Sequence, residues 1–207
     1  MCGIYGISER NLSWVKSYMR KCHYRGPDNN DTYCDENVTL GHNLLSITDT
    51  PSQGIQPWKT NKGNILIYNG EIFNYYDLCN RYTNFKPKTQ CDTELLAWGL
   101  DEFGIDFVEQ IDSMHAFVLW DIKTKQLFLS RDHAGIKPLY YSQNNGVIVF
   151  GSEAKGLLDI VPGSRNIDHT AFTCWNISGL NVSNHSFFKG IKKLMPGETL
   201  RYDIKTK

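Results

Sequence analysis

Short apolar runs alternate with polar turns along most of the chain, a pattern typical of strands joined in hairpins. The segments predicted to be extended are residues 2–8, 32–34, 38–44, 64–68, 116–121, 126–131, 139–143, 146–151 and 198–203. The turn Asn144-Asn145-Gly146 carries the Asn-Gly pair favoured in tight hairpins. The pattern therefore predicts mostly antiparallel pairing.

Helical periodicity is found in four stretches between these strands. In the first, Asn11 or Ser13 is the predicted N-cap of a helix that ends near Cys22, with its apolar residues on one face. The other predicted helices are residues 75–82, 92–102 and 152–158. Hairpin strands with helices between them predict an α+β fold of antiparallel sheets covered by helices. Because no linker divides the sequence, residues 1–207 are expected to form a single domain.

Three polar segments interrupt the periodic ones. Residues 24–31 and 48–57 are predicted loops because they are rich in Gly, Pro, Asn, Asp and other polar residues. Asn69-Gly70-Glu71 directly follows a buried apolar run and is predicted to be a sharp turn at a strand end.

The composition indicates a globular protein and argues against nucleic acids and membranes as partners. Hydrophobic residues make up 41% of the chain, enough for a packed core, and the formal net charge is zero. Without a basic block, nucleic acids and membrane surfaces are not expected as partners. The sequence has neither an apolar run long enough to span a bilayer nor a signal sequence, so a cytoplasmic location is expected.

The cysteines and glycines indicate chemistry without a metal or cofactor. The six cysteines are Cys2, Cys22, Cys34, Cys79, Cys91 and Cys174, and none forms a C-x-x-C pair. We therefore expect no zinc or other metal site, and free thiols in a reducing compartment. The sequence also lacks a Ser-Gly-Gly-hydroxyl loop for ATP pyrophosphate, so the chain should not itself activate a substrate with ATP.

Cys2 directly follows the initiator methionine. Removal of Met1, which a small second residue permits, would give Cys2 a free α-amine with a reference pKa of about 7.7–8.0. A single residue would then supply a nucleophilic thiol and its general base, as in N-terminal nucleophile hydrolases. The alternative is a second-position cysteine without any function.

Three further polar positions have a functional and a structural interpretation. The Asn69 amide and the Gly70 N–H can donate to one point, as an oxyanion hole requires, or form an ordinary Asn-Gly turn. Asp92 can hold a substrate ammonium or be an N-cap. The rigid segment Arg25-Gly26-Pro27-Asp28 can support a site or form a structural turn.

Several motifs occur in a fixed order. They are Met1-Cys2-Gly3-Ile4, Arg25-Gly26-Pro27-Asp28, Leu45-Ser46-Ile47, Asn69-Gly70-Glu71-Ile72-Phe73-Asn74 and Asp92-Thr93-Glu94. This succession resembles the class II glutamine amidotransferases. Two later stretches, Arg131-Asp132-His133-Ala134-Gly135-Ile136-Lys137-Pro138-Leu139-Tyr140-Tyr141 and Gly151-Ser152-Glu153-Ala154-Lys155, are similar to the glutaminase domain of glutamine-dependent asparagine synthetases.

The resemblance, which spans nearly the whole chain, implies a four-layer αββα sandwich. It implies that Cys2 attacks the side-chain amide of L-glutamine and that Asn69 and Gly70 stabilise the oxyanion. It also implies that an ATP-dependent synthetase, on another chain or a further domain, receives the ammonia. The residues that it assigns to the glutamine pocket are Leu45, Ile47, Asn69, Gly70, Glu71 and Asp92, with Arg25 in a supporting loop.

Two departures from the family pattern leave the activity open. Leu44 stands where the family usually carries an arginine that grips the substrate carboxylate, and Tyr24 replaces the usual histidine. One hypothesis is an active glutaminase in which Lys59 or Lys62 compensates for the arginine. The others are a regulatory or assembly module with weak or no activity, and an N-terminal cysteine amidase for another amide.

Overall fold

The computed structural model describes residues 1–46 and 54–206. Its strands are β1 (Gly3–Ile7), β2 (Asn29–Cys34), β3 (Thr39–Leu44), β4 (Trp58–Lys59), β5 (Ile65–Ile72), β6 (Ser113–Asp121), β7 (Gln126–Arg131), β8 (Tyr140–Asn144), β9 (Val147–Gly151), β10 (Lys192–Lys193) and β11 (Thr199–Asp203). Its helices are α1 (Leu12–Lys21), α2 (Tyr75–Arg81), α3 (Asp92–Phe103), α4 (Ala154–Leu157) and α5 (His169–Ser178), with 3₁₀ helices η1 (His23–Arg25) and η2 (Gly104–Gln110).

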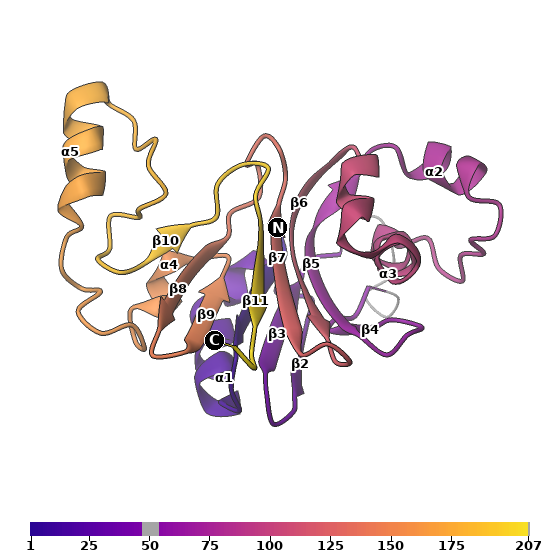
Figure 1. Ribbon diagram of the computed structural model, residues 1–207, viewed down its shortest axis with the longest axis horizontal. Helices are drawn as coiled ribbons and strands as arrows, with labels where there is room; N and C mark the ends of the chain where they lie inside the picture. The colour runs from indigo at the N-terminus through magenta and orange to yellow at the C-terminus, as the bar shows by residue number, and fades with distance from the viewer. Residues whose placement is uncertain (47–53, 207) are drawn as a thin grey trace.

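Two antiparallel sheets form the centre of the molecule (Figure 1). The first sheet has the strand order β10-β8-β9-β1-β3-β2, and the second has the order β11-β7-β6-β5-β4. Apolar side chains from alternate positions of both sheets meet in one buried cluster, among them Ile4, Leu40, Ile67 and Val118. Burial of this shared face holds the two sheets together.

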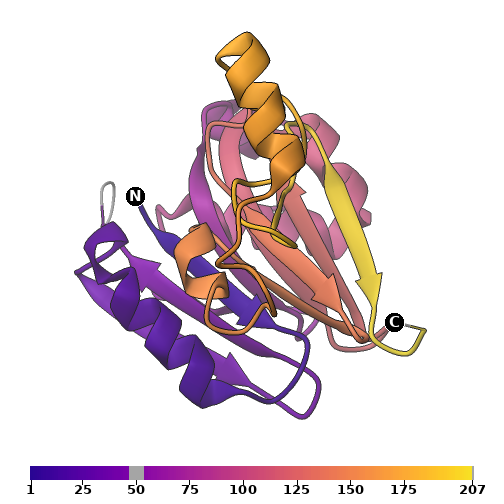
Figure 2. The ribbon, with the colours of Figure 1, turned by 90° about the vertical axis from the view of Figure 1, so that its left-hand side faces the viewer.

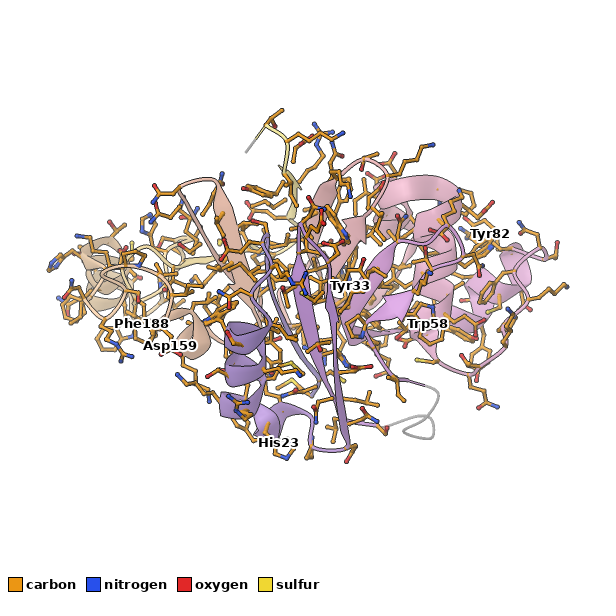
Figure 3. The ribbon with its side chains drawn as sticks, turned by 90° about the horizontal axis from the view of Figure 1, so that it is seen from below. His23, Tyr33, Trp58, Tyr82, Asp159 and Phe188 are labelled. Carbon is orange, nitrogen blue, oxygen red and sulfur yellow. The ribbon has the colours of Figure 1, made fainter. Side chains whose placement is uncertain are left out.

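Helices cover the outer face of each sheet. Tyr5 of β1 packs in one cluster with Tyr18 of α1 and Leu157 of α4. On the other side, Phe117 of β6 packs with Leu96 of α3. Figure 3 shows labelled residues of the α2 side and of the α4–α5 side at opposite ends of the molecule. The predicted αββα sandwich is therefore confirmed.

The first helix and most predicted strands are confirmed, with ends that differ by a few residues. Asn11 is the N-cap of α1, because its side chain accepts a hydrogen bond from the Trp14 N–H at 3.2 Å. The predicted loop 24–31 is wrong at its end, since β2 begins at Asn29 and pairs with β3. β2 is an edge strand with half-exposed polar side chains, so its composition resembles that of a loop.

The predicted turn at Asn69-Gly70-Glu71 is also wrong, because these residues lie inside β5 and pair with β6. Gly70 serves close packing rather than a turn. A Cβ atom at this position would lie 2.4 Å from the Met114 carbonyl oxygen and 2.5 Å from the Tyr68 ring. The glycine therefore allows the strand to pass a bulky ring without distortion.

Helix α5 was not predicted, and it projects from one end of the molecule (Figure 2). Only Ala171 of this helix is buried, so the sequence has no apolar periodicity there. Its capping signals are present, however. Asp168 accepts from the Ala171 N–H at 3.0 Å, and Gly179 ends the helix in the left-handed conformation. None of the described helices is long and apolar enough to cross a membrane.

Candidate active site

Cys2 lies at the edge of the space between the two sheets. Side chains alternate along a strand, and Ile4 points into the inter-sheet core, so Cys2 lies on the same side. Its Sγ atom contacts the backbone just beyond β3, 3.4 Å from the Leu45 nitrogen and 3.7 Å from the Leu45 oxygen. These contacts hold the thiol against the end of the neighbouring strand.

Burial raises the pKa of the Cys2 thiol above its ordinary value. The Leu45 N–H, the terminal amino group and Lys137 act in the opposite direction, whereas Asp92 adds to the rise. Burial also lowers the pKa of the terminal amine, here carried by Met1, with Arg25 and Lys137 contributing. These surroundings favour the neutral form of the Met1 amine.

Asn69 places an unpaired donor on the facing sheet. Ile65 and Ile67 of β5 belong to the inter-sheet core, so Asn69 also faces the first sheet. Its side chain is 2% exposed, and its Nδ2 atom has no hydrogen-bond partner among the described residues. Such a donor costs about 1–3 kcal/mol when it is left unsatisfied. Asn69 therefore carries a donor that is ready for an acceptor from a substrate.

The Gly70 N–H points to the open edge of β5. Two N–H groups of β5 point away from β6 and donate to side chains. The Tyr68 N–H donates to Gln56 at 2.6 Å, and the Ile72 N–H donates to Asp92 at 3.0 Å. Because N–H direction alternates along a strand, Gly70 directs its N–H to the same edge. The described residues offer this N–H no side-chain acceptor, so it is a second free donor beside Asn69.

Asp92 is anchored to β5 rather than used as a helix cap. It is the first residue of α3, and the N-cap is Cys91, so the N-cap interpretation is wrong. Its Oδ2 atom accepts from the Tyr68 hydroxyl at 2.9 Å and from the Ile72 N–H at 3.0 Å. Burial raises the Asp92 pKa, and no salt bridge reaches this carboxylate within the described residues. A half-buried carboxylate without an ion-pair partner in the described residues suits a substrate ammonium.

The Arg25–Asp28 loop supports Cys2. Arg25 is buried. Its Nε atom donates to the Cys2 carbonyl at 3.1 Å, and its Nη1 atom donates to the Glu153 carboxylate at 2.7 Å. Its Nη2 atom is buried and unpaired among the described residues. The Asp28 carboxylate accepts from the Ser46 N–H at 2.8 Å. The loop thereby ties Cys2 to the segment that follows β3.

The remaining predicted pocket residues differ in how the structure places them. Leu45 is half-buried against Cys2, and Glu71 is exposed on the same side of β5 as Asn69. Ile47 lies outside the described residues, as does much of the predicted loop 48–57.

Leu44 occupies a buried position beside Cys2. It is 6% exposed, and it lies on the inter-sheet side of β3 together with Leu40. Gly3 pairs with Asn43 in the β1–β3 ladder, so the next pair outward brings Cys2 opposite Leu44. An apolar side chain therefore stands next to Cys2, where the resemblance implies an arginine.

Lys59 and Lys62 do not provide the predicted compensating charge. Lys59 pairs with Ile65, four residues and about 13 Å along β5 from Asn69. The Lys62 ammonium donates to the Asp101 carbonyl. Both lysines line a depression next to Tyr33 and Lys123, away from Cys2. Their proposed role was wrong because the sequence could not place the loop that follows Pro57.

The sequence analysis missed three residues that the structure brings to this site. Glu153 accepts from Arg25, Tyr68 donates to Asp92, and the charge of Lys137 acts to lower the pKa of the Cys2 thiol. Glu153 and Lys137 stand in the two later motifs of the sequence, but neither residue type alone distinguishes them from surface residues.

Comparison with known proteins agrees with this geometry. A family model described as a glutamine amidotransferase domain matches residues 1–207. The asparagine synthetase [glutamine-hydrolyzing] 2 of Bacillus subtilis is 34% identical over 221 residues, covering 100% of this chain and 29% of that protein. The asparagine synthetase [glutamine-hydrolyzing] 3 of the same organism is 33% identical over 216 residues, covering 98% and 35%. The chain thus spans only about a third of the length of these curated relatives.

A solved structure supports the fold. The glutamine phosphoribosylpyrophosphate amidotransferase of B. subtilis, complexed with ADP and GMP, superposes with a TM-score of 0.64 at 18% identity. The match covers 75% of this chain and 43% of that one. The two-sheet sandwich, the family match over the whole chain and the position of Cys2 lead to one conclusion. The chain belongs to the class II glutamine amidotransferases, whose nucleophile is an N-terminal cysteine.

Proposed function

We propose that this chain is a glutaminase domain that hydrolyses L-glutamine to glutamate and ammonia. The observation that supports the proposal is the buried Asn69 amide, whose Nδ2 atom has no partner among the described residues and which lies on the sheet facing that of Cys2. The relatives named as glutamine-hydrolysing asparagine synthetases support glutamine as the substrate.

In the proposed first step, the α-amine of Met1-free Cys2 takes the thiol proton. The thiolate sulfur then bonds to the side-chain amide carbon of glutamine, and the carbonyl electron pair moves onto oxygen. Asn69 Nδ2 and the Gly70 N–H donate to this oxyanion, with each such donor contributing roughly 10²–10³ in rate. Asp92 holds the substrate ammonium, and Leu45 and Glu71 line the pocket.

The second half of the reaction releases ammonia and then regenerates the free thiol of the enzyme. The oxyanion collapses, the carbon–nitrogen bond breaks, and the α-ammonium gives its proton to the leaving nitrogen, which departs as ammonia. Water then loses a proton to the amine and attacks the thioester carbon. The carbon–sulfur bond breaks, the sulfur regains its proton, and glutamate leaves.

We propose an ATP-dependent synthetase of the asparagine synthetase type as the acceptor of the ammonia. The names of the relatives support this partner, and the chain covers only 29% and 35% of their lengths. The acceptor is therefore a separate chain or a further part of a longer one.

The test is to incubate Met1-free protein with L-glutamine and to measure glutamate and ammonia. Equal amounts of both are expected without ATP or added metal, and mass spectrometry of the active protein should show that Met1 has been removed. If the Met1-free, folded protein releases no glutamate, the proposal is wrong.

A second candidate is a glutaminase-like regulatory or assembly module with weak or no activity. The observation that favours it is the buried Leu44 beside Cys2, where a carboxylate-binding arginine is expected. The Arg25 guanidinium contacts the Cys2 carbonyl, and its Nη2 atom, which has no partner among the described residues, is the group that would compensate. The two candidates differ in whether glutamine binds with ordinary affinity.

Leu44→Arg is expected to lower KM for glutamine by at least about tenfold. A charge-assisted contact with a carboxylate contributes roughly 1.5–3 kcal/mol, which corresponds to that change in affinity. Leu44→Met is the matched control, because it keeps an apolar side chain of similar volume, and its KM should match that of the wild type. Thermal unfolding shows whether the buried arginine is tolerated.

The opposite result is equally informative. If the wild-type KM is already ordinary and Leu44→Arg leaves it unchanged, the carboxylate is bound by another group and the argument from Leu44 is wrong. If Leu44→Arg does not fold, Leu44→Gln tests whether a hydrogen-bond donor at this position lowers KM.

A further inference from the structure

His42 is a fully buried histidine of β3 that faces the second sheet. It pairs with Ile4 in the β1–β3 ladder, and Ile4 belongs to the inter-sheet core, so both side chains point between the sheets. The His42 Nε2 atom lies 3.2 Å from the Tyr68 carbonyl oxygen of β5. A side chain of the first sheet thus reaches the backbone of the second sheet directly beside Asn69.

This contact fixes the proton on the His42 ring. A carbonyl oxygen can only accept, so Nε2 carries the hydrogen and donates to Tyr68. Burial lowers the pKa of His42 to about 4, so the ring is neutral near pH 7. The Nδ1 atom is buried and has no partner among the described residues, which is costly. The cost at Nδ1 indicates that His42 is placed for the bond that Nε2 makes.

The Tyr68 carbonyl lies on the open edge of β5 and needs such a donor. In the described residues, the pairing of β4 with β5 ends at Leu66. The N–H and C=O of one residue point to the same side of an antiparallel strand, and the Tyr68 N–H donates at this edge to Gln56. Within the described chain no strand pairs with Tyr68 on this edge, so His42 takes the place of a neighbouring strand.

Tyr68 is held at three points. Its N–H donates to Gln56 at 2.6 Å, its carbonyl accepts from His42 at 3.2 Å, and its hydroxyl donates to Asp92 at 2.9 Å. The carbonyl belongs to the peptide unit that joins Tyr68 to Asn69. Because a peptide unit is planar, a bond that fixes this carbonyl also fixes the backbone nitrogen of Asn69. The position from which the Asn69 side chain starts therefore depends on His42.

We propose that His42 is a positioning residue that fixes the Tyr68–Asn69 peptide unit and so places the Asn69 amide at the substrate oxyanion. This inference rests on the proposed glutaminase mechanism, because it names a residue that supports an oxyanion donor. His42 exchanges no proton in the reaction and acts through the β5 backbone. Catalytic donors must be held within about 0.5 Å of their productive position, and a misplacement of 1 Å can cost about a hundredfold in rate.

Two amide side chains test the reach of the Nε2–H donor. The amide nitrogen of glutamine is as many bonds from the backbone as histidine Nε2, whereas that of asparagine is one bond closer. In Met1-free protein, His42→Asn and His42→Leu should lower kcat for glutamine by at least about tenfold, with a much smaller change in KM. His42→Gln should keep kcat within about threefold of the wild type. Alkylation of Cys2 by iodoacetamide should be unchanged in all three variants, because the nucleophile keeps its contacts.

A double substitution shows whether His42 acts through Asn69. In the Asn69→Ala background, His42→Asn should lower kcat by less than about threefold, because the donor that it positions is already missing. If the tenfold effect persists in that background, His42 acts independently of Asn69 and the proposal is wrong.

The NMR signal of the Asn69 side-chain amide, assigned by its loss in Asn69→Ala, gives a readout that needs no activity. It should shift in His42→Asn and His42→Leu and stay in place in His42→Gln. If it does so while the wild type releases no glutamate, the positioning role stands and the proposed glutaminase function falls.

Other results would contradict the role of His42. The proposal is wrong if folded His42→Asn keeps the wild-type kcat, or if His42→Gln loses as much as His42→Asn. It is also wrong if Cys2 alkylation falls together with kcat, since His42 would then support the site as a whole. Should none of the variants fold, the ¹⁵N signals of the wild-type ring decide, because a proton on Nδ1 in place of Nε2 excludes the bond to Tyr68.

Discussion

Cys2→Ala is expected to abolish glutamate release, lowering kcat/KM for glutamine by at least about 10⁴-fold, because no other residue can form the thioester. The α-amine, Asn69 and Asp92 would remain in place, but they only assist a nucleophile that the variant lacks. Activity is measured as glutamate release over time, with the spontaneous hydrolysis of glutamine subtracted.

The fold of Cys2→Ala should be intact. The lost contacts are those of one half-buried sulfur with the Leu45 backbone, at 3.4 and 3.7 Å, so thermal unfolding should change little. Cys34→Ala is the matched control, because it removes another half-buried thiol that contacts Asp35 and Thr39, away from the site. Retained activity in folded Cys2→Ala, or equal loss in Cys34→Ala, would contradict the nucleophile assignment.

The general architecture could be predicted because most strands show a recognisable pattern of apolar residues in their own sequence. β7 contains the apolar run Leu127-Phe128-Leu129 and has the predicted ends, and its Leu127 and Leu129 are buried between the sheets. Elements without a buried face were less predictable. β2 is a polar edge strand, and α5 buries only Ala171, so neither shows the apolar period on which the prediction depends.

The candidate site was partly predictable for a different reason. Cys2, Asn69 and Asp92 stand in motifs, and the structure brings them to one end of the sandwich. The turn interpretation of Asn69-Gly70 was wrong because the Gly70 position is set by the Tyr68 ring and a carbonyl of the neighbouring strand. The contacts of Glu153 with Arg25 and of Tyr68 with Asp92 depend on long-range packing that no local pattern contains.

Asn69→Ala is expected to lower kcat for glutamine by roughly 10²–10³-fold, the usual effect of removing one oxyanion donor. The donor acts where charge develops in the transition state, so KM should change much less than kcat. Steady-state kinetics with L-glutamine checks the division between the two constants.

The same substitution should leave the stability of the free protein unchanged or slightly raised. The Asn69 Nδ2 atom is buried and unpaired among the described residues, so its removal relieves a cost of about 1–3 kcal/mol, which offsets the lost packing. Asn43 provides the matched control, because its Nδ2 atom donates to the Met19 carbonyl at 2.9 Å and to that of Cys22 at 3.2 Å. Asn43→Ala should therefore destabilise the fold by about 1–3 kcal/mol.

The contrast between these two asparagines tests the proposed catalytic role of Asn69. Both are buried, yet within the described part of the chain only the Nδ2 atom of Asn43 has acceptors. A donor kept unpaired at a cost in stability is explained if an acceptor arrives with the substrate. If Asn69→Ala loses as much stability as Asn43→Ala, Asn69 is part of the structural framework. If it keeps full kcat, the oxyanion assignment is wrong.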